Sequence, residues 1–146
     1  MLDKKKILAK LDEMDHYLEE LESIKPLDLE GYTGSIEKKR ACERLLQISI
    51  ESIIDICNIL ISNLKLGIPA DEDELFEKLK NKKVITDKMK KILNEMKGFR
   101  NILVHKYWIV DNELVFENLE KTSDFQDFKE EILNFLKAVT IKPFSL

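Results

Sequence analysis

The sequence predicts an all-α protein, an antiparallel up-and-down bundle of four to six helices. Apolar residues make up 44% of the chain and charged residues 36%, with only four glycines and three prolines. This composition is too apolar for disorder and too poor in turn-forming residues for a β-sandwich. Apolar side chains also recur at steps of three and four residues, and capping residues precede several of these segments.

The length of the chain predicts one domain. At 146 residues it is long enough to bury one continuous core, so we expect a single domain over residues 1–146. No apolar run approaches the roughly 20 residues needed to span a bilayer, and residues 1–6 lack the apolar stretch of a secretory signal. We therefore expect a cytoplasmic protein with no membrane partner.

The first helix is predicted from an amphipathic pattern that ends before Pro26. Its apolar residues alternate with lysine, aspartate and glutamate at helical spacing. A loop is expected over residues 26–34, because Gly31 and Gly34 interrupt helices, and Ser35 is a candidate N-cap for the next helix. The apolar residues of the first helix are Ile7, Leu8, Leu11, Met14, Leu18 and Leu21.

The second predicted helix, residues 36–66, is the longest and most apolar, and we expect it at the centre of the bundle. Gly67 and Pro69 provide its stop signal. One stripe of this helix is polar and has two readings. It is either a solvent-facing strip, or it lines a cleft or subunit interface in which acidic groups orient a cation or a basic side chain. The stripe comprises Gln47, Glu51, Asp55, Asn58 and Ser62.

Periodicity and capping residues predict four further helices. Thr86 is a candidate N-cap for the second of these, Asp111 for the third, and Ser123 or Asp124 for the last. These helices cover residues 71–80, 87–105, 112–119 (after the cap at Asp111) and 123–139.

Charge is unevenly distributed along the chain. The formal net charge of −4 argues against indiscriminate binding to nucleic acids, but residues 80–106 contain nine basic residues and only two acidic ones. A basic stretch of this kind can follow a phosphate backbone. A run of lysines on a helix can equally be a solvated face, and the sequence leaves both readings open.

The search for a neutral-pH acid or base is short, because the chain has two histidines. His16 lies among acidic residues of the first helix and is interpreted as a surface residue. His105 lies at the end of the basic stretch, close to Arg100, Asn101 and Tyr107. The segment 100–107 is therefore the candidate site.

Helical geometry separates the two principal residues of this segment. A five-residue step on an ideal helix turns Arg100 and His105 about 140° apart. They meet only if the arginine reaches around the helix, if the helix loosens near His105, or if two copies of the segment face each other. This geometry favours a site in a dimer cleft.

The chemistry available to these residues is cleavage of an RNA phosphodiester without a metal ion. His105 is suited to exchange protons with the ribose 2′-hydroxyl or the leaving 5′-oxygen, and Arg100 to stabilise charge on pentacoordinate phosphorus. Asn101, with Lys97 and Lys106, is a candidate for binding phosphate. Because the sequence has neither zinc-type spacing nor a glycine-rich phosphate loop, we expect no metal and no cofactor.

A family resemblance supports this interpretation. The segment 98–108, Gly-Phe-Arg-Asn-Ile-Leu-Val-His-Lys-Tyr-Trp, resembles the signature of the HEPN superfamily, in particular its HepT toxin branch. The family pattern is an arginine, four residues, a histidine, one residue and a tyrosine, and Arg100, His105 and Tyr107 match it. The resemblance extends to residues 39–44, to Glu51 and Asp55, and to residues 86–110.

The resemblance implies an all-helical, HEPN-like fold that is usually homodimeric. It also implies a metal-independent endoribonuclease that acts as the toxin of a toxin–antitoxin pair. The implied partner is a minimal nucleotidyltransferase antitoxin, which in this family silences the toxin by transferring AMP to the motif tyrosine, here Tyr107. An AMP group there adds negative charge beside Arg100 and competes with RNA phosphate.

A second hypothesis stays open at this point. The chain is then a non-catalytic helical binding module, or a substrate-binding partner, that docks a nucleotidyltransferase through Glu51, Asp55 and Asn58 or through the motif cleft. It predicts a stable complex and no RNA cleavage.

Overall fold

The chain folds into helices throughout residues 2–141, which the computed structural model describes apart from the side chains of residues 107, 140 and 141. The predicted all-α class is confirmed, and the described part has seven α-helices, one more than the largest expected number. The elements are α1 (Lys4–Ile24), α2 (Leu29–Thr33), α3 (Ile36–Asn63), α4 (Glu72–Asn81), α5 (Asp87–His105), the 3-10 helix η1 (Tyr107–Ile109), α6 (Asn112–Leu119) and α7 (Ser123–Ile141).

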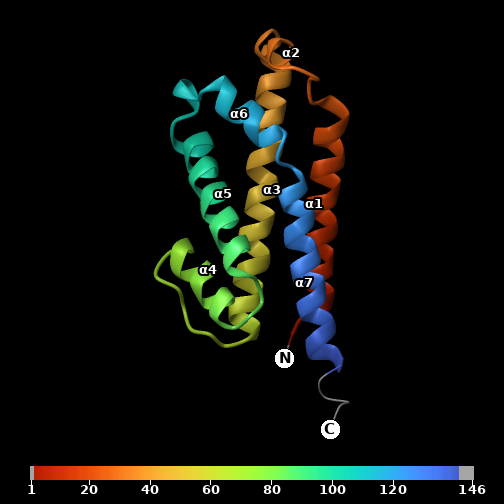
Figure 1. Cartoon of the computed structure of the whole chain (residues 1–146), viewed down its shortest axis with the longest axis vertical. Coiled ribbons are helices and arrows are strands. Elements are labelled where there is room, and N and C mark those ends of the chain that lie inside the picture. Colours follow the sequence, from red (N-terminus) through yellow and green to blue (C-terminus); the bar gives the residue numbers. More distant parts are fainter. Residues whose placement is uncertain (1, 142–146) are drawn as a thin grey trace.

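Four long helices run up and down along the longest axis of the molecule. Figure 1 shows α1, α3, α5 and α7 in this arrangement, with α4 beside α5 at one end and α2 and α6 at the other. α1, α4 and α5 all pack against α3, and α2 packs against α6. The antiparallel bundle expected from the sequence is therefore the observed architecture.

α3 is the core helix of this bundle. Its length and hydropathy alone would allow it to cross a membrane, whereas no such segment was expected from the apolar runs of the sequence. In the fold, however, 56% of the most apolar window of α3 is buried against neighbouring helices. Among its residues, Ile53, Ile56, Cys57 and Leu60 are almost completely inaccessible to solvent. The apolar character of α3 is explained by the core that it forms.

The predicted loop over residues 26–34 is wrong in part, because the structure forms the short helix α2 there. The Asp28 side chain accepts a hydrogen bond from the Gly31 N–H at 2.7 Å and caps this helix. Tyr32 is fully buried, with its ring centroid 6.4 Å from that of Phe116 in α6. Capping by Asp28 and burial of Tyr32 thus outweigh the helix-breaking tendency of the two glycines.

The end of α3 also differs from the prediction. The helix stops at Asn63, three residues before the expected Leu66. Lys65 adopts a left-handed backbone with φ of +54°, and the Leu66 N–H donates to the Ile61 carbonyl at 3.1 Å, which satisfies the last turn. The helix therefore ends at non-glycine residues, before the stop predicted at Gly67.

The remaining boundaries agree closely with the sequence. α5 and α6 begin and end as predicted. α4 begins one residue later, because Asp71 is its N-cap and accepts from the Glu74 N–H at 2.8 Å. α7 continues two residues past the expected residue 139.

Candidate functional site

α5 holds the candidate residues on a regular helix. Its first turn is fixed by Thr86, whose hydroxyl accepts from the Met89 N–H at 3.1 Å. Its last residue is His105, after which the Lys106 N–H donates to the Ile102 carbonyl at 2.9 Å. The side chains that anchor α5 in the core are Met89, Leu93, Met96, Phe99 and Leu103. The orientation of the site is therefore set by core packing.

The guanidinium of Arg100 is bound within the chain. Its Nη2 atom donates to both carboxylate oxygens of Glu72, at 2.5 and 2.7 Å. The side chain of Arg100 is 17% exposed and that of Glu72 is 30% exposed. The Nε atom of Arg100 is buried and has no hydrogen-bond partner in the described part of the chain. Arg100 thus faces α4, with only part of its donor capacity used.

The antiparallel pairing of α4 and α5 brings Glu72 to this position. Glu77 in the middle of α4 pairs with Lys90, whereas Glu72 at the start of α4 pairs with Arg100, further along α5. Leu75, one of three buried apolar residues of α4, helps to seat this helix on the core. The position of Glu72 therefore follows from how the α4–α5 hairpin closes.

Glu72 also lies close to the core helix. Burial raises the pKa of the Cys57 thiol in α3, and the negative charge of Glu72 raises it further. A carboxylate that acts on a buried thiol of α3 and binds a guanidinium of α5 lies where three helices meet.

A different face of α5 is open. Lys97, Asn101 and His105 follow one another at steps of four residues, so they form one row along the helix. Lys97 is half-buried, and Asn101 and His105 are exposed. Lys106, which follows the helix, is also exposed. This row presents a cation, an amide and an imidazole to any ligand that approaches the end of α5.

The structure does not bring Arg100 and His105 together within one chain. α5 stays helical through His105, so the expected separation of about 140° around the axis applies. The helix therefore does not loosen before His105, and the guanidinium turns toward α4 instead. Hollows in the described surface lie between α1 and α7, between α5 and α7, and around the start of α5, and no motif residue lines these hollows.

Tyr107 opens η1, immediately after the end of α5. Its side chain lies outside the described part of the structure, so its role stays a prediction. The neighbouring Trp108 and Ile109 are 68% and 65% exposed, and Val104 on the last turn of α5 is 38% exposed. Three large apolar side chains therefore surround the motif at the surface.

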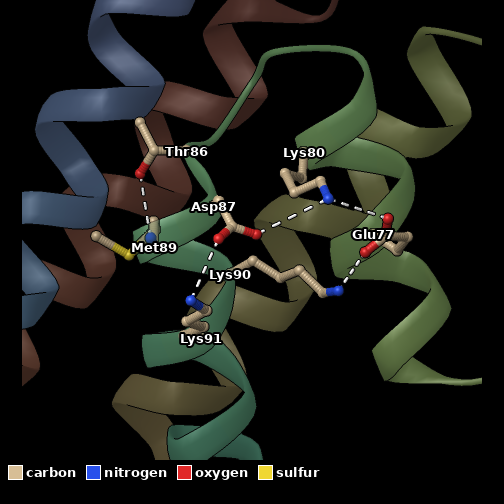
Figure 2. Close-up of polar contacts among 7 residues, drawn as sticks. All are labelled: Glu77, Lys80, Thr86, Asp87, Met89, Lys90 and Lys91. Carbon is tan, nitrogen blue, oxygen red and sulfur yellow. Dashed lines mark hydrogen bonds and ion pairs between the residues drawn. The ribbon is translucent and has the colours of Figure 1, made fainter.

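Three lysines of the basic stretch are neutralised by local ion pairs around the start of α5. Figure 2 shows Lys80 between Glu77 and Asp87, at 3.2 and 3.8 Å, and Lys90 bound to Glu77. Lys91 pairs with Asp87 at 3.4 Å. A hydrogen bond from Lys90 is the main cause that lowers the pKa of Glu77, and the same bond raises the pKa of Lys90. Lys80 and Lys90 thus link α4 to α5, whereas the pair of Lys91 lies within α5.

The polar stripe predicted on α3, which contains Glu51 and Asp55, lies in the solvent-facing part of that helix. Glu51 is half-buried and accepts a hydrogen bond from Gln47 at 3.2 Å. Asp55 is exposed and pairs with Lys10 of α1 at 3.6 Å. The first contact lies within α3, the second joins α1 to α3, and neither involves a residue of α5. A place for Glu51 and Asp55 in the site stays a prediction.

Sequence reasoning did not find Glu72. The acidic run of residues 72–74 is the composition expected at any helix N-terminus, so it carries no separate signal. The one available clue was the spacing of the α4–α5 hairpin, which places the start of α4 beside the end of α5.

Comparison with known proteins places this arrangement in a family. Residues 14–133 match the family model described as ribonuclease HepT-like. The tRNA nuclease HepT of Aphanizomenon flos-aquae is 33% identical over 110 residues, which cover 75% of each chain.

Solved structures agree with these matches. The cytosolic protein YutE of Bacillus subtilis superposes with a TM-score of 0.80 and 25% identity, over 94% of this chain and 92% of YutE. A tri-AMPylated HEPN toxin of Shewanella oneidensis, in complex with MNT antitoxin, superposes with a TM-score of 0.82 and 25% identity, over 92% of this chain and 99% of that one.

Proposed function

Because the chain belongs to the ribonuclease HepT-like family, we propose that it is a metal-independent endoribonuclease, the toxin of a toxin–antitoxin pair. The observation that carries the proposal is the end of α5, where Arg100 and His105 stand five residues apart and Tyr107 follows. The chain acts as a single HEPN-like domain over residues 1–146. The cytosolic description of YutE and the burial of α3 support a cytoplasmic location.

The proposed reaction is an internal transfer at phosphorus. The ribose 2′-oxygen attacks the phosphorus, its proton passes to a base, and the bond from phosphorus to the 5′-oxygen breaks as that oxygen gains a proton. The products are a 2′,3′-cyclic phosphate and a 5′-hydroxyl. His105 provides one of these proton transfers, and Arg100 stabilises the charge on the phosphoryl oxygens. Lys97, Asn101 and Lys106 bind neighbouring phosphates.

We propose that the active assembly is a homodimer or a higher homo-oligomer. One chain turns Arg100 toward α4 and leaves His105 exposed on another face of α5, so a second copy has to supply the missing neighbour. The exposed apolar side chains of Val104, Trp108 and Ile109 around the motif support such an interface. Each cleft then contains residues from two chains.

The proposed regulator is a minimal nucleotidyltransferase antitoxin that transfers AMP to Tyr107. The support is the structural similarity to a tri-AMPylated HEPN toxin bound to MNT antitoxin. Tyr107 follows α5 directly, beside the exposed Lys106 and His105. An AMP phosphate at this place competes with RNA phosphate for the same cations.

The test is an RNA cleavage assay in excess chelator. We expect the purified protein to produce fragments that end in 2′,3′-cyclic phosphate, and His105→Ala to lower the rate by roughly 10²- to 10⁴-fold. The matched control is His16→Ala, because His16 is an exposed residue of α1 whose ring contacts the Asp12 carbonyl at 2.8 Å. Equal cleavage by the wild type and by His105→Ala contradicts the proposal. Absence of cleavage together with a stable antitoxin complex supports a binding module instead.

A further inference from the structure

We propose that Glu72 is the positioning residue for Arg100, which it holds by Nη2 so that Nη1 is left to bind the RNA phosphate. This inference rests on the proposed function. It assigns to α4 a role in the chemistry of a motif that lies entirely on α5.

Glu72 binds only one nitrogen of the Arg100 guanidinium. Both carboxylate oxygens of Glu72 accept from one nitrogen, Nη2, at 2.5 and 2.7 Å. Nη1 carries two further N–H donors, and in the described part of the chain it has no hydrogen-bond partner. A phosphate oxygen is the acceptor that a guanidinium prefers at such an edge. Glu72 thus occupies Nη2 of the guanidinium and leaves Nη1 for an anion.

Fixing the long side chain of Arg100 in advance reduces the entropy that it loses when a ligand binds. A free arginine loses considerable rotamer entropy when it binds a ligand, whereas a guanidinium already held by a carboxylate has lost it beforehand. Glu72 is the first residue of α4, where the helix dipole favours its negative charge. Arg100 is accordingly 17% exposed, which restricts the directions that its side chain can take.

The contact between Glu72 and Arg100 is distinct from the contacts that support the fold. α4 is already attached to α5 through two other ion pairs, Glu77 with Lys90 and Lys80 with Asp87. Buried Phe76 and Leu79 anchor the same helix on the core. The Glu72 pair is thus an additional contact, and it is directed at the one cation of α5 that belongs to the motif.

The opposite role makes an opposite prediction. If Glu72 were a latch that competes with phosphate for Arg100, its removal would release the guanidinium and lower the KM for RNA or raise the rate. If Glu72 positions Arg100, its removal lowers kcat and leaves KM nearly unchanged, because the open face of Lys97, Asn101 and His105 still binds RNA.

The experiment measures kcat and KM of the full chain on one RNA for three variants. We expect Glu72→Gln to lower kcat by roughly 10- to 100-fold, the effect of a displaced catalytic group, with KM within about twofold of the wild type. Glu72→Asp, which keeps the charge, recovers part of the loss. Asp73→Asn removes the same charge from an exposed neighbour and keeps wild-type kinetics. Urea unfolding of each variant identifies any loss that is due to folding.

A second readout does not depend on cleavage. The Nε–H signal of Arg100 in a ¹⁵N NMR spectrum is assigned as the signal lost in Arg100→Lys. We expect this signal to shift and to show increased side-chain motion in Glu72→Gln, and to stay as in the wild type in Asp73→Asn. An unchanged signal in Glu72→Gln overturns the inference, as does an unchanged or higher kcat. A wild-type protein that cleaves no RNA contradicts the proposed function separately, and the NMR result still decides whether Glu72 fixes Arg100.

Discussion

The two ends of α5 carry similar positive charge and use it differently. At the start, Lys80, Lys90 and Lys91 are paired with acidic residues of α4 and of α5 itself. At the end, Arg100 is held by Glu72, whereas Lys97 and Lys106 have no ion pair in the described part of the chain. The first end is a structural joint, and the second retains donors for a ligand.

This difference shows that a count of charges along a sequence is not a map of electrostatic potential. Nine basic residues in the stretch 80–106 suggest one uniform stripe. The fold divides that stripe, because Glu77 of α4 and Asp87 of α5 pair with the lysines at its first part. An RNA is therefore expected to contact mainly the far end of α5.

Among the differences between the two ends of α5, the largest expected effect comes from removing the cation of the motif. Arg100→Ala is expected to lower kcat by roughly 10²- to 10³-fold, because it removes a donor that stabilises transition-state charge. Lys90→Ala removes one charge from the other end of the same helix and leaves kcat unchanged. Single-turnover cleavage assays measure both. Equal losses in the two variants contradict the division of α5 into a joint and a site.

A smaller effect is expected in the salt dependence of RNA binding. The double variant Lys97→Gln, Lys106→Gln is expected to reduce the slope of log affinity against log salt by about 0.7 per lost phosphate contact. Lys80→Gln with Lys90→Gln makes the same change in charge and is expected to change the slope less. Fluorescence anisotropy on a labelled RNA, in a His105→Ala background, provides the slopes. A greater change in the second variant disproves this assignment of the two ends.

The structural role of the start of α5 is tested by the stability of the fold. Thr86 caps α5 and also donates to Glu131 of α7 at 3.0 Å, so Thr86→Ala is expected to cost about 1 kcal/mol of unfolding free energy. Thr86→Ser keeps the hydroxyl and is expected to retain most of that stability. Urea unfolding measures the difference. Cleavage by the folded Thr86→Ala protein should match the wild type, and a loss of kcat there would show that the start of α5 also influences the site.

The smallest effect is a dependence of stability on pH. Hydrogen bonds from Lys90 and Lys80 lower the pKa of Glu77 in the folded state. Its contribution to stability is therefore present above the ordinary glutamate value of 4.5 and is lost as the pH falls through the lower, folded-state pKa. Thermal unfolding of the wild type and of Glu77→Gln should differ at neutral pH and converge in acid. A difference that persists in strong acid would exclude this ion pair as its source.

Most of the helices could be predicted from the sequence, because their signals are local. Thr86 and Asp111 cap α5 and α6 from the position directly before each helix, and both boundaries agree with the structure. The misplaced elements depend on distant contacts. α2 depends on burial of Tyr32 against Phe116, 84 positions away in the sequence, and no local pattern reports that contact.

The candidate site divides in the same way. The sequence by itself determined which residues of α5 share a face, and hence that Arg100 and His105 point apart, because the helical repeat is a local property. Only the tertiary structure decided that Arg100 meets Glu72 and that Lys90 meets Glu77. The physical reason is that these contacts arise when α4 folds back antiparallel to α5, and that closure is set by packing on the core.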